Sequence, residues 1–183
     1  MDPLQVSMTG VRMGERFLQI GCHDRALLSG LAAKVGLSGL AAVAAFDDDQ
    51  TKRAAAVGSK VGALIETKTI APSTSVRSGG PLLPFESDQF DMVVVDDTSG
   101  AFASIEDNAR VDYLRDARRT VREGGRIEIV EGVKSLPPDY DAIRDLTTAG
   151  FKPVRVLAER DGLRFVEGLR AHGGADDPAR TRS

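Results

Sequence analysis

The order of apolar segments constrains this chain most, because strand-like runs alternate with helix-like stretches along nearly its whole length. The run at residues 17–20 is followed by apolar residues at spacings of three and four from Ala26 to Val35, the pattern of a helix with one buried face. The uninterrupted apolar run at 40–46 is typical of a strand buried on both faces of a parallel sheet. Because parallel neighbours need crossover connections, this alternation predicts a sheet with helices on both faces.

The rest of the chain continues the pattern and ends in a different way. Strands are expected at three further places and helices at two: strands at 63–67, 90–96 and 126–130, and helices at 52–61 and 140–149. Another helix, after a capping box at Ser104 and Asp107, is expected to end at Gly124-Gly125. Asp161-Gly162 separates two strand-like runs, which indicates an antiparallel hairpin. The predicted fold class is therefore α/β, with a doubly wound, mostly parallel, Rossmann-like sheet that closes in a C-terminal antiparallel hairpin.

Length and charge limit the classes of protein that this chain can represent. Its 183 residues suit one domain, which we expect at residues 15–170, with an N-terminal extension at 1–14 and a mobile C-terminal tail at 171–183. The formal net charge of −3 argues against a general nucleic-acid binder. No apolar run is long enough to span a bilayer and no signal peptide is visible, so a cytoplasmic location is expected.

Four segments in this order resemble the class I S-adenosylmethionine-dependent methyltransferases, and in particular their small-molecule branch. They are Glu15–Cys22, which looks like the first strand and glycine loop, Leu83–Val94, which looks like the entry to the fourth strand, Tyr113–Arg126, which looks like the helix and double-glycine turn before the fifth, and Ala149–Val154, which looks like the entry to the sixth. The resemblance implies a seven-stranded Rossmann-like sheet, S-adenosylmethionine as the cofactor, and methyl transfer as the reaction.

The resemblance also implies where a cofactor would bind, since ligands of open α/β sheets lie outside the carboxyl ends of the strands. Gly21, Cys22 and His23 form the loop after the first strand, whose backbone would approach the amino-acid end of the cofactor. Asp47, with Asp48 beside it, follows the second strand and would accept the ribose hydroxyls. The alternative, which we weigh equally for Asp47, is that these aspartates only cap a helix and add surface charge.

Two further positions are implied by the family pattern, and no catalytic residue is assigned. Ser78 lies in the stretch where the family often places an acid that contacts the adenine end, and its hydroxyl offers a replacement hydrogen bond. Asp96 ends the fourth strand, where a methyltransferase places residues that face cofactor and substrate. No acceptor-specific motif, such as Asn/Asp-Pro-Pro-Tyr, is present.

The glycine loop departs from the family pattern of Gly-x-Gly-x-Gly. Its three glycine positions hold Gly21, His23 and Arg25, so only the first glycine remains. The side chains of His23 and Arg25 are large enough to fill the groove meant for the methionine part of the cofactor, and Arg25 would then place a cation near the sulfonium. The alternative is that a long side chain swings outward. A Rossmann dinucleotide site fits less well, because Gly-x-Gly-x-x-Gly is also reduced to its first glycine.

The loop residues leave other chemistry open. His23 has the residue type of a general base or of a metal ligand with the nearby aspartates, but a surface loop histidine is the preferred interpretation, and no His/Cys cluster has metal-ligand spacing. Cys22 is a possible nucleophile, and a buried, inert thiol is preferred.

Two functions from different classes remain. One is a methyltransferase that acts on a small molecule. The other is a non-catalytic methyltransferase-like domain that has lost cofactor binding and serves as a binding or assembly module. The partners expected are a small-molecule substrate or a protein, with a homodimer as the base-rate assembly, and neither a membrane nor nucleic acid.

Overall fold

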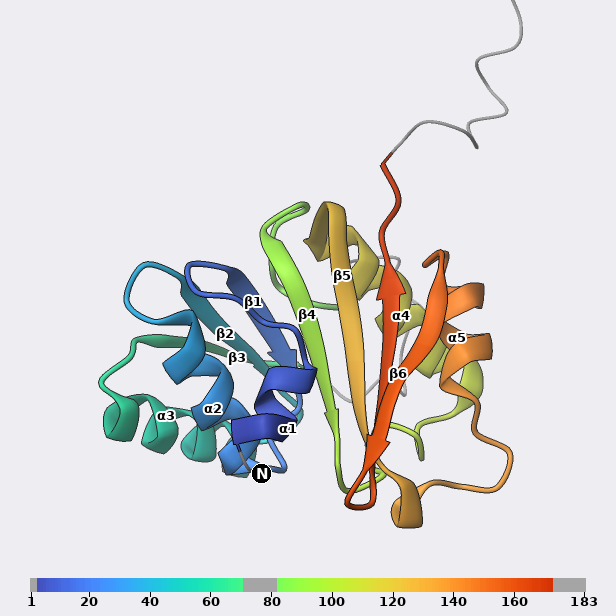
Figure 1. The fold of residues 1–183 in the computed structure, drawn as a ribbon, viewed down its shortest axis with the longest axis horizontal. Helices are drawn as coiled ribbons and strands as arrows, with labels where there is room; N and C mark the ends of the chain where they lie inside the picture. Colours follow the sequence, from blue (N-terminus) through green and yellow to red (C-terminus); the bar gives the residue numbers. More distant parts are fainter. Residues whose placement is uncertain (1–2, 71–81, 173–183) are drawn as a thin grey trace, which may run out of the picture.

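In a computed structural model that describes residues 3–70 and 82–172, one seven-stranded sheet has the order β3-β2-β1-β4-β5-β7-β6 (Figure 1). β7 runs antiparallel to both of its neighbours, and the other pairings are parallel. The strands are β1 (Arg16–Ile20), β2 (Leu40–Ala45), β3 (Ile65–Thr69), β4 (Phe90–Asp97), β5 (Val121–Gly132), β6 (Val154–Arg160) and β7 (Leu163–Leu169). The predicted fold class, with its C-terminal hairpin, is confirmed.

Helices cover both faces of the sheet. They are α1 (Pro3–Met8), α2 (Arg25–Val35), α3 (Asp48–Val61), α4 (Asp107–Thr120) and α5 (Ala142–Thr148), with a short 3-10 helix, η1, at Val133–Ser135. In Figure 1, α1 and α2 lie in front of the sheet, and α4 and α5 lie behind it. Each face has its own core, because alternate residues of a strand point to opposite faces: Phe17 packs with α2 and α3, whereas Leu18 and Ile20 pack with α4 and α5.

Two helix boundaries differ from expectation. The N-cap of α4 is Glu106, whose side chain accepts a hydrogen bond from the Ala109 N–H, whereas the Ser104 hydroxyl donates to the Gly100 carbonyl at 2.7 Å. The capping box was therefore wrong, because Ser104 belongs to the preceding turn. The same helix ends at Thr120, and Gly124-Gly125 lies inside the long strand β5.

Parts of the predictions fall outside the described residues. Ser78 lies there, as does the expected C-terminal tail from residue 173 onward. Within the expected N-terminal extension, Val6 and Val11 are buried, and the Gly10 carbonyl accepts a hydrogen bond from Arg126. No helix in the described ranges is long and apolar enough to cross a membrane.

Candidate functional site

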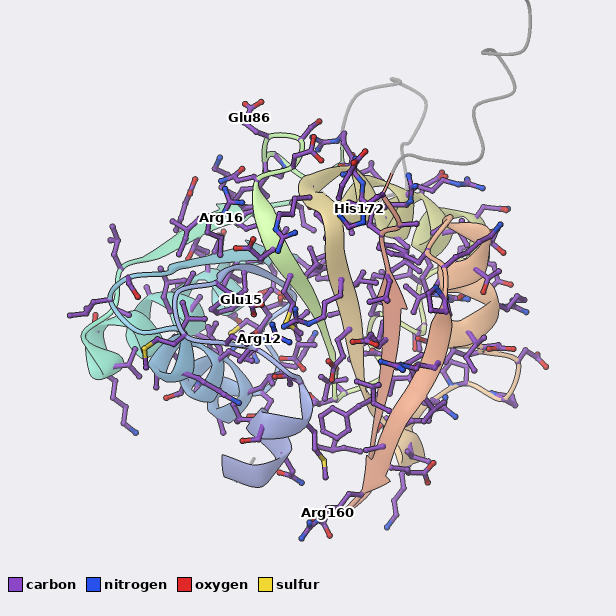
Figure 2. The ribbon with its side chains drawn as sticks, turned by 45° about the horizontal axis from the view of Figure 1, so that its top comes forward. Arg12, Glu15, Arg16, Glu86, Arg160 and His172 are labelled. Atoms are coloured by element: carbon purple, nitrogen blue, oxygen red, sulfur yellow. The ribbon has the colours of Figure 1, made fainter. Side chains whose placement is uncertain are left out.

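The carboxyl ends of β1, β2 and β4 bring three of the predicted site residues to one edge of the sheet. Ile20 is in register with Ala44 of β2 and with Val95 of β4. Gly21, Asp47 and Asp96 follow or end these strands, so they meet at this edge. Figure 2 shows the direction of the sheet: Arg160, at the tip of the β6–β7 hairpin, lies at the carboxyl edge, and Glu86, which precedes β4, lies at the opposite edge.

Asp96 clamps the loop after β1 onto the end of β4. Its Oδ2 accepts hydrogen bonds from the backbone N–H groups of His23 at 2.7 Å and Asp24 at 2.8 Å. Its Oδ1 accepts from the Thr98 hydroxyl at 2.7 Å. The residue is 1% exposed, so both oxygens act inside the protein. Asp96 therefore holds the loop closed, and the ligand contact that the resemblance implies for this residue stays a prediction.

The clamp gives a first prediction. Replacing Asp96 by alanine leaves two backbone N–H groups without their charged acceptor, and we expect the free energy of unfolding to fall by about 2 kcal/mol. Chemical denaturation measures this loss, and hydrogen exchange at the His23 and Asp24 amides should quicken locally. Thr98→Ala is the control, since it removes one neutral donor and leaves the loop bonds in place. Unchanged amide protection in Asp96→Ala would contradict the clamp.

The Gln50 side chain also holds the loops after β1 and β2 together, and the sequence analysis did not single it out. The side chain is buried, and its Oε1 accepts from the Cys22 N–H at 3.0 Å and from the Phe46 N–H at 3.3 Å. Its Nε2 donates to Asp47 Oδ2 at 3.3 Å and lies 3.4 Å from His23 Nε2. The available signal was a polar side chain on the third residue of α3, on the side of the helix that faces the sheet.

Asp47 caps α3, as one of the two interpretations predicted. Its Oδ1 accepts a hydrogen bond from the Gln50 N–H at 2.7 Å. The residue is exposed, as are Asp48 and Asp49 in the first turn of the helix. Capping does not remove Asp47 from solvent, so ribose binding by this carboxylate stays a prediction.

His23 and Arg25, which replace two glycines of the family pattern, point their side chains in different directions. A Cβ on Gly21 would lie 3.7 Å from the His23 ring and 3.8 Å from the Phe46 ring. His23 therefore folds back over the start of the loop, where the cofactor groove was expected. Arg25 is exposed and lines a different hollow, between α1, α2 and α3. Of the two possibilities for Arg25, the structure shows the outward one, because α2 begins at this residue and carries its side chain to the outer face.

Cys22 does not have the surroundings of a reactive thiol. Cys22 is fully buried, as expected, and burial raises the pKa of its thiol to about 11. The thiolate is the reactive form, so this cysteine is inert at neutral pH. Within residues 3–70 and 82–172, no group of three or more His, Cys, Asp and Glu side chains has the arrangement of a metal site.

A second group of polar side chains lies at the same edge, on the face covered by α4 and α5. Asp97 is in register with Glu131 of β5, and both are fully buried. Burial raises the pKa of Asp97 to about 7. This happens although its carboxylate accepts hydrogen bonds from the backbone N–H groups of Phe102 and Ala103, which favour the charged form. This carboxyl group therefore exchanges its proton near neutral pH, and nothing in the sequence pattern had singled it out.

Tyr140 completes this second group. Burial first, and then the nearby Glu131 and Asp97 carboxylates, raise the pKa of its hydroxyl, which keeps it protonated. The other side of Glu131 is held by Arg164, whose Nε lies 2.6 Å from Oε2. Tyr140 and Arg164 also line a hollow of about 470 Å³ beside β6 and β7. The edge thus combines a closed loop at β1 with an acidic, partly hollow region at β4 and β5.

Comparisons with known proteins agree with this geometry. No family model matches the chain. The chain is 26% identical over 171 residues to the ubiquinone/menaquinone biosynthesis C-methyltransferase UbiE of Ectopseudomonas mendocina, and 25% identical to that of Azotobacter vinelandii. Each match covers 91% of this chain and 62% or 63% of the relative, so the chain spans about three fifths of the length of these curated relatives.

Solved structures share the fold at lower identity. A SAM-dependent methyltransferase from Aquifex aeolicus superposes with a TM-score of 0.71 at 16% identity, covering 93% of this chain and 90% of that one. The cyclase SpnF superposes with a TM-score of 0.69 at 11% identity, covering 93% and 82%. The resemblance to the class I methyltransferase family is confirmed, and the cyclase shows that this fold also carries another reaction.

Proposed function

We propose that this chain, whose sequence and fold resemble the class I S-adenosylmethionine-dependent methyltransferases, binds S-adenosylmethionine at the carboxyl ends of β1 and β2 and transfers its methyl group to a small molecule. The observation that carries the proposal is the placement of Gly21 and the exposed carboxylate of Asp47 at one edge of a sheet with this strand order. The family resemblance of the curated relatives supports it.

The residues fit such a ligand unequally at its two ends. Asp47 is exposed and presents a carboxylate that suits two ribose hydroxyls, with Asp48 next to it. At the loop, Gly21 has φ of +80°, and a Cβ there would lie 3.3 Å from the Asp96 carbonyl. A glycine is therefore what allows the loop backbone to lie this close to the end of β4. The His23 ring lies over the same place, and it has to turn away before a ligand can reach the loop.

Methyl transfer from a sulfonium needs little help from acid or base groups. The sulfonium supplies an activated methyl group, and the protein's part is to hold the acceptor nucleophile in line with it and to exclude water. Asp47 and the Gly21–Cys22 backbone would bind and orient the ligand, and the Asp96 clamp would keep the loop fixed. The acceptor side is proposed at the carboxyl ends of β4 and β5.

Calorimetric titration with S-adenosylmethionine and S-adenosylhomocysteine tests the proposal. His23→Gly should bind S-adenosylhomocysteine about tenfold more tightly than the parent chain, equivalent to about 1.4 kcal/mol, because it opens the approach to Gly21. Arg25→Gly is the matched control, since this side chain lies on the outer face, and its affinity should equal the parent's. Absence of heat and of thermal stabilisation in all three proteins at millimolar ligand would overturn cofactor binding.

The alternative function, a non-catalytic binding or assembly module, has one specific observation in its favour. The loop N–H groups are already engaged: Cys22 donates to Gln50, and His23 and Asp24 donate to Asp96. A loop that satisfies its own donors is stable without a ligand. No measurable binding of S-adenosylmethionine or S-adenosylhomocysteine by either the parent chain or His23→Gly would favour this module over the enzyme.

Several finer statements stay predictions. They are a cytoplasmic location, a homodimer, a protein partner, and a contact from Ser78 to the cofactor. Sedimentation of the purified chain tests the homodimer, and Ser78→Ala in the same calorimetric titration tests the contact.

A further inference from the structure

A hollow of about 840 Å³ lies between α1, α2 and α3, on the side of α2 that faces away from the sheet; we call it the α2–α3 groove. Its wall at α1 is fixed by Val6, which packs so closely on Gly30 that a Cβ at Gly30 would come within 2.4 Å of it. Small-molecule sites in proteins commonly measure about 300–1,000 Å³. The groove therefore has the size of a ligand site.

The lining of the groove has two chemical parts. Small apolar side chains, including the exposed Ala33 and Ala56, line it together with the buried Val57. Its charged residues are all cations, Arg25, Lys34 and Lys60, and no described residue that lines it is acidic. A hollow with apolar walls and only positive charge suits a ligand with an apolar body and a negative group.

The cations are placed at the two ends of the groove. α2 and α3 each follow a strand of the parallel part of the sheet, so they run in the same direction. Lys34 and Lys60 occupy the last turns of these two helices, at the same end. Arg25 begins α2, at the far end. Helix dipoles favour cations in a last turn, which explains part of this placement but not the apolar hollow beside it.

The ammonium groups of Lys34 and Lys60 are not neutralised by an acidic partner among the described residues. Within the described part of the chain, neither has a hydrogen bond or an ion pair, although the protein as a whole carries a net negative charge of −3. Some other basic residues of the described ranges, such as Arg126 with Glu15, are paired with acids. Two unpaired ammonium groups at one end of a groove can neutralise one anionic head group without breaking an existing bond.

We propose that the α2–α3 groove binds an amphipathic anion, a molecule with one carboxylate or similar head group and a short alkyl body. The head group lies between Lys34 and Lys60, and the alkyl body lies along Ala33, Ala56 and Val57. This site is independent of the proposed methyltransferase function, because it lies on the outer side of α2.

Titration of the full chain with octanoate tests the site, with acetate and octan-1-ol as probes that lack one half of the chemistry. Octanoate should bind at least about tenfold more tightly than either. The double change Lys34→Gln with Lys60→Gln should weaken octanoate binding about tenfold, whereas Arg25→Gln, at the far end, should leave it within about threefold. Ala33→Leu should also weaken it, because its larger side chain narrows the groove.

Two outcomes would overturn the proposal. One is equal binding of octanoate and octan-1-ol, which would remove the role of the charge. The other is an octanoate affinity that is unchanged in both the double lysine variant and Ala33→Leu. Circular dichroism and the Tm without ligand establish that the variants are folded, and since the changed side chains lie at the surface of the groove, both should match the parent.

Discussion

Replacing Asp145 by alanine is expected to lower the free energy of unfolding by about 3–5 kcal/mol, because it leaves the guanidinium of Arg110 buried without its main partner. Arg110 is 1% exposed and Asp145 is 2% exposed, and Nε of the arginine lies 2.6 Å from Oδ2 of the aspartate. A charge held this far from water is costly unless it is paired.

Arg110 joins three parts of the fold, which is why the effect should be large. Its NH1 group donates to the Ala103 carbonyl at 2.8 Å and to the Ile105 carbonyl at 2.6 Å, in the turn before α4. Its NH2 group contacts Asp107, and its guanidinium carbon lies 4.9 Å from the centre of the Tyr140 ring. Loss of Asp145 therefore loosens α5, the turn and the β4–β5 edge together.

Urea unfolding of Asp145→Ala measures this effect, and α4 supplies a matched control. Asp112 pairs with Arg115 at 2.8 Å on the solvent side of the same helix. Exposed pairs contribute about 0–1 kcal/mol, so Asp112→Ala should change the stability by no more than that. A loss in Asp145→Ala as small as in the control would contradict the role of the buried pair. The double variant Arg110→Met with Asp145→Leu should recover part of the stability, because no unpaired charge remains.

The second large effect concerns Glu128, in the middle of β5. A row of side chains crosses one face of the sheet at this level, and it consists of Gln19, Val94, Glu128, Glu167 and Arg155. Glu128 is fully buried, and neither of its carboxylate oxygens has a hydrogen-bond partner within the described residues. Burial, and then the charge of Glu167 directly opposite, raise the pKa of Glu128 well above its ordinary value of 4.5.

This raised pKa makes the stability fall as the pH rises. Below pH 4.5 the carboxyl group is protonated in both the folded and the unfolded chain, so it adds no pH dependence. Above that value the unfolded chain releases the proton while the folded chain keeps it, and each pH unit costs about 1.4 kcal/mol of stability. The cost stops growing only when the pH passes the pKa of the folded state.

Glu128→Gln removes this titration and keeps the shape of the side chain. The variant should gain stability relative to the parent as the pH rises above 4.5, by up to about 1.4 kcal/mol per pH unit until the pH passes the folded-state pKa of Glu128. Urea unfolding at several pH values gives this difference, and any constant cost of burying the amide cancels in its slope. Glu123→Gln, which changes an exposed carboxylate in the same strand, is the matched control variant. A flat difference for Glu128→Gln would mean that Glu128 is ionised in the folded protein.

Local chemistry made much of this architecture predictable. The apolar runs 17–20 and 40–46 and the Asp-Gly turn at Asp161-Gly162 depend on neighbours in sequence, and they specified strands, crossover helices and the hairpin. Asp24 and Asp47 likewise cap α2 and α3, because a capping side chain reaches only two or three residues along its own chain. Ser104 failed as a cap because Glu106, two residues on, competes for the same role.

The hydrogen bonds, side-chain directions and burial at the candidate site depend on the tertiary structure. Gly21, Asp47 and Asp96 could be placed at one edge of a sheet from the sequence, because the alternation of elements makes the strands parallel and parallel strands end at the same edge. The sequence did not determine that Asp96 and Gln50 bind the loop N–H groups, that His23 covers Gly21 while Arg25 turns away, or that Asp97 and Glu128 lose their contact with water. These outcomes depend on side chains from strands and helices that are distant in sequence, and only packing brings them within reach of one another.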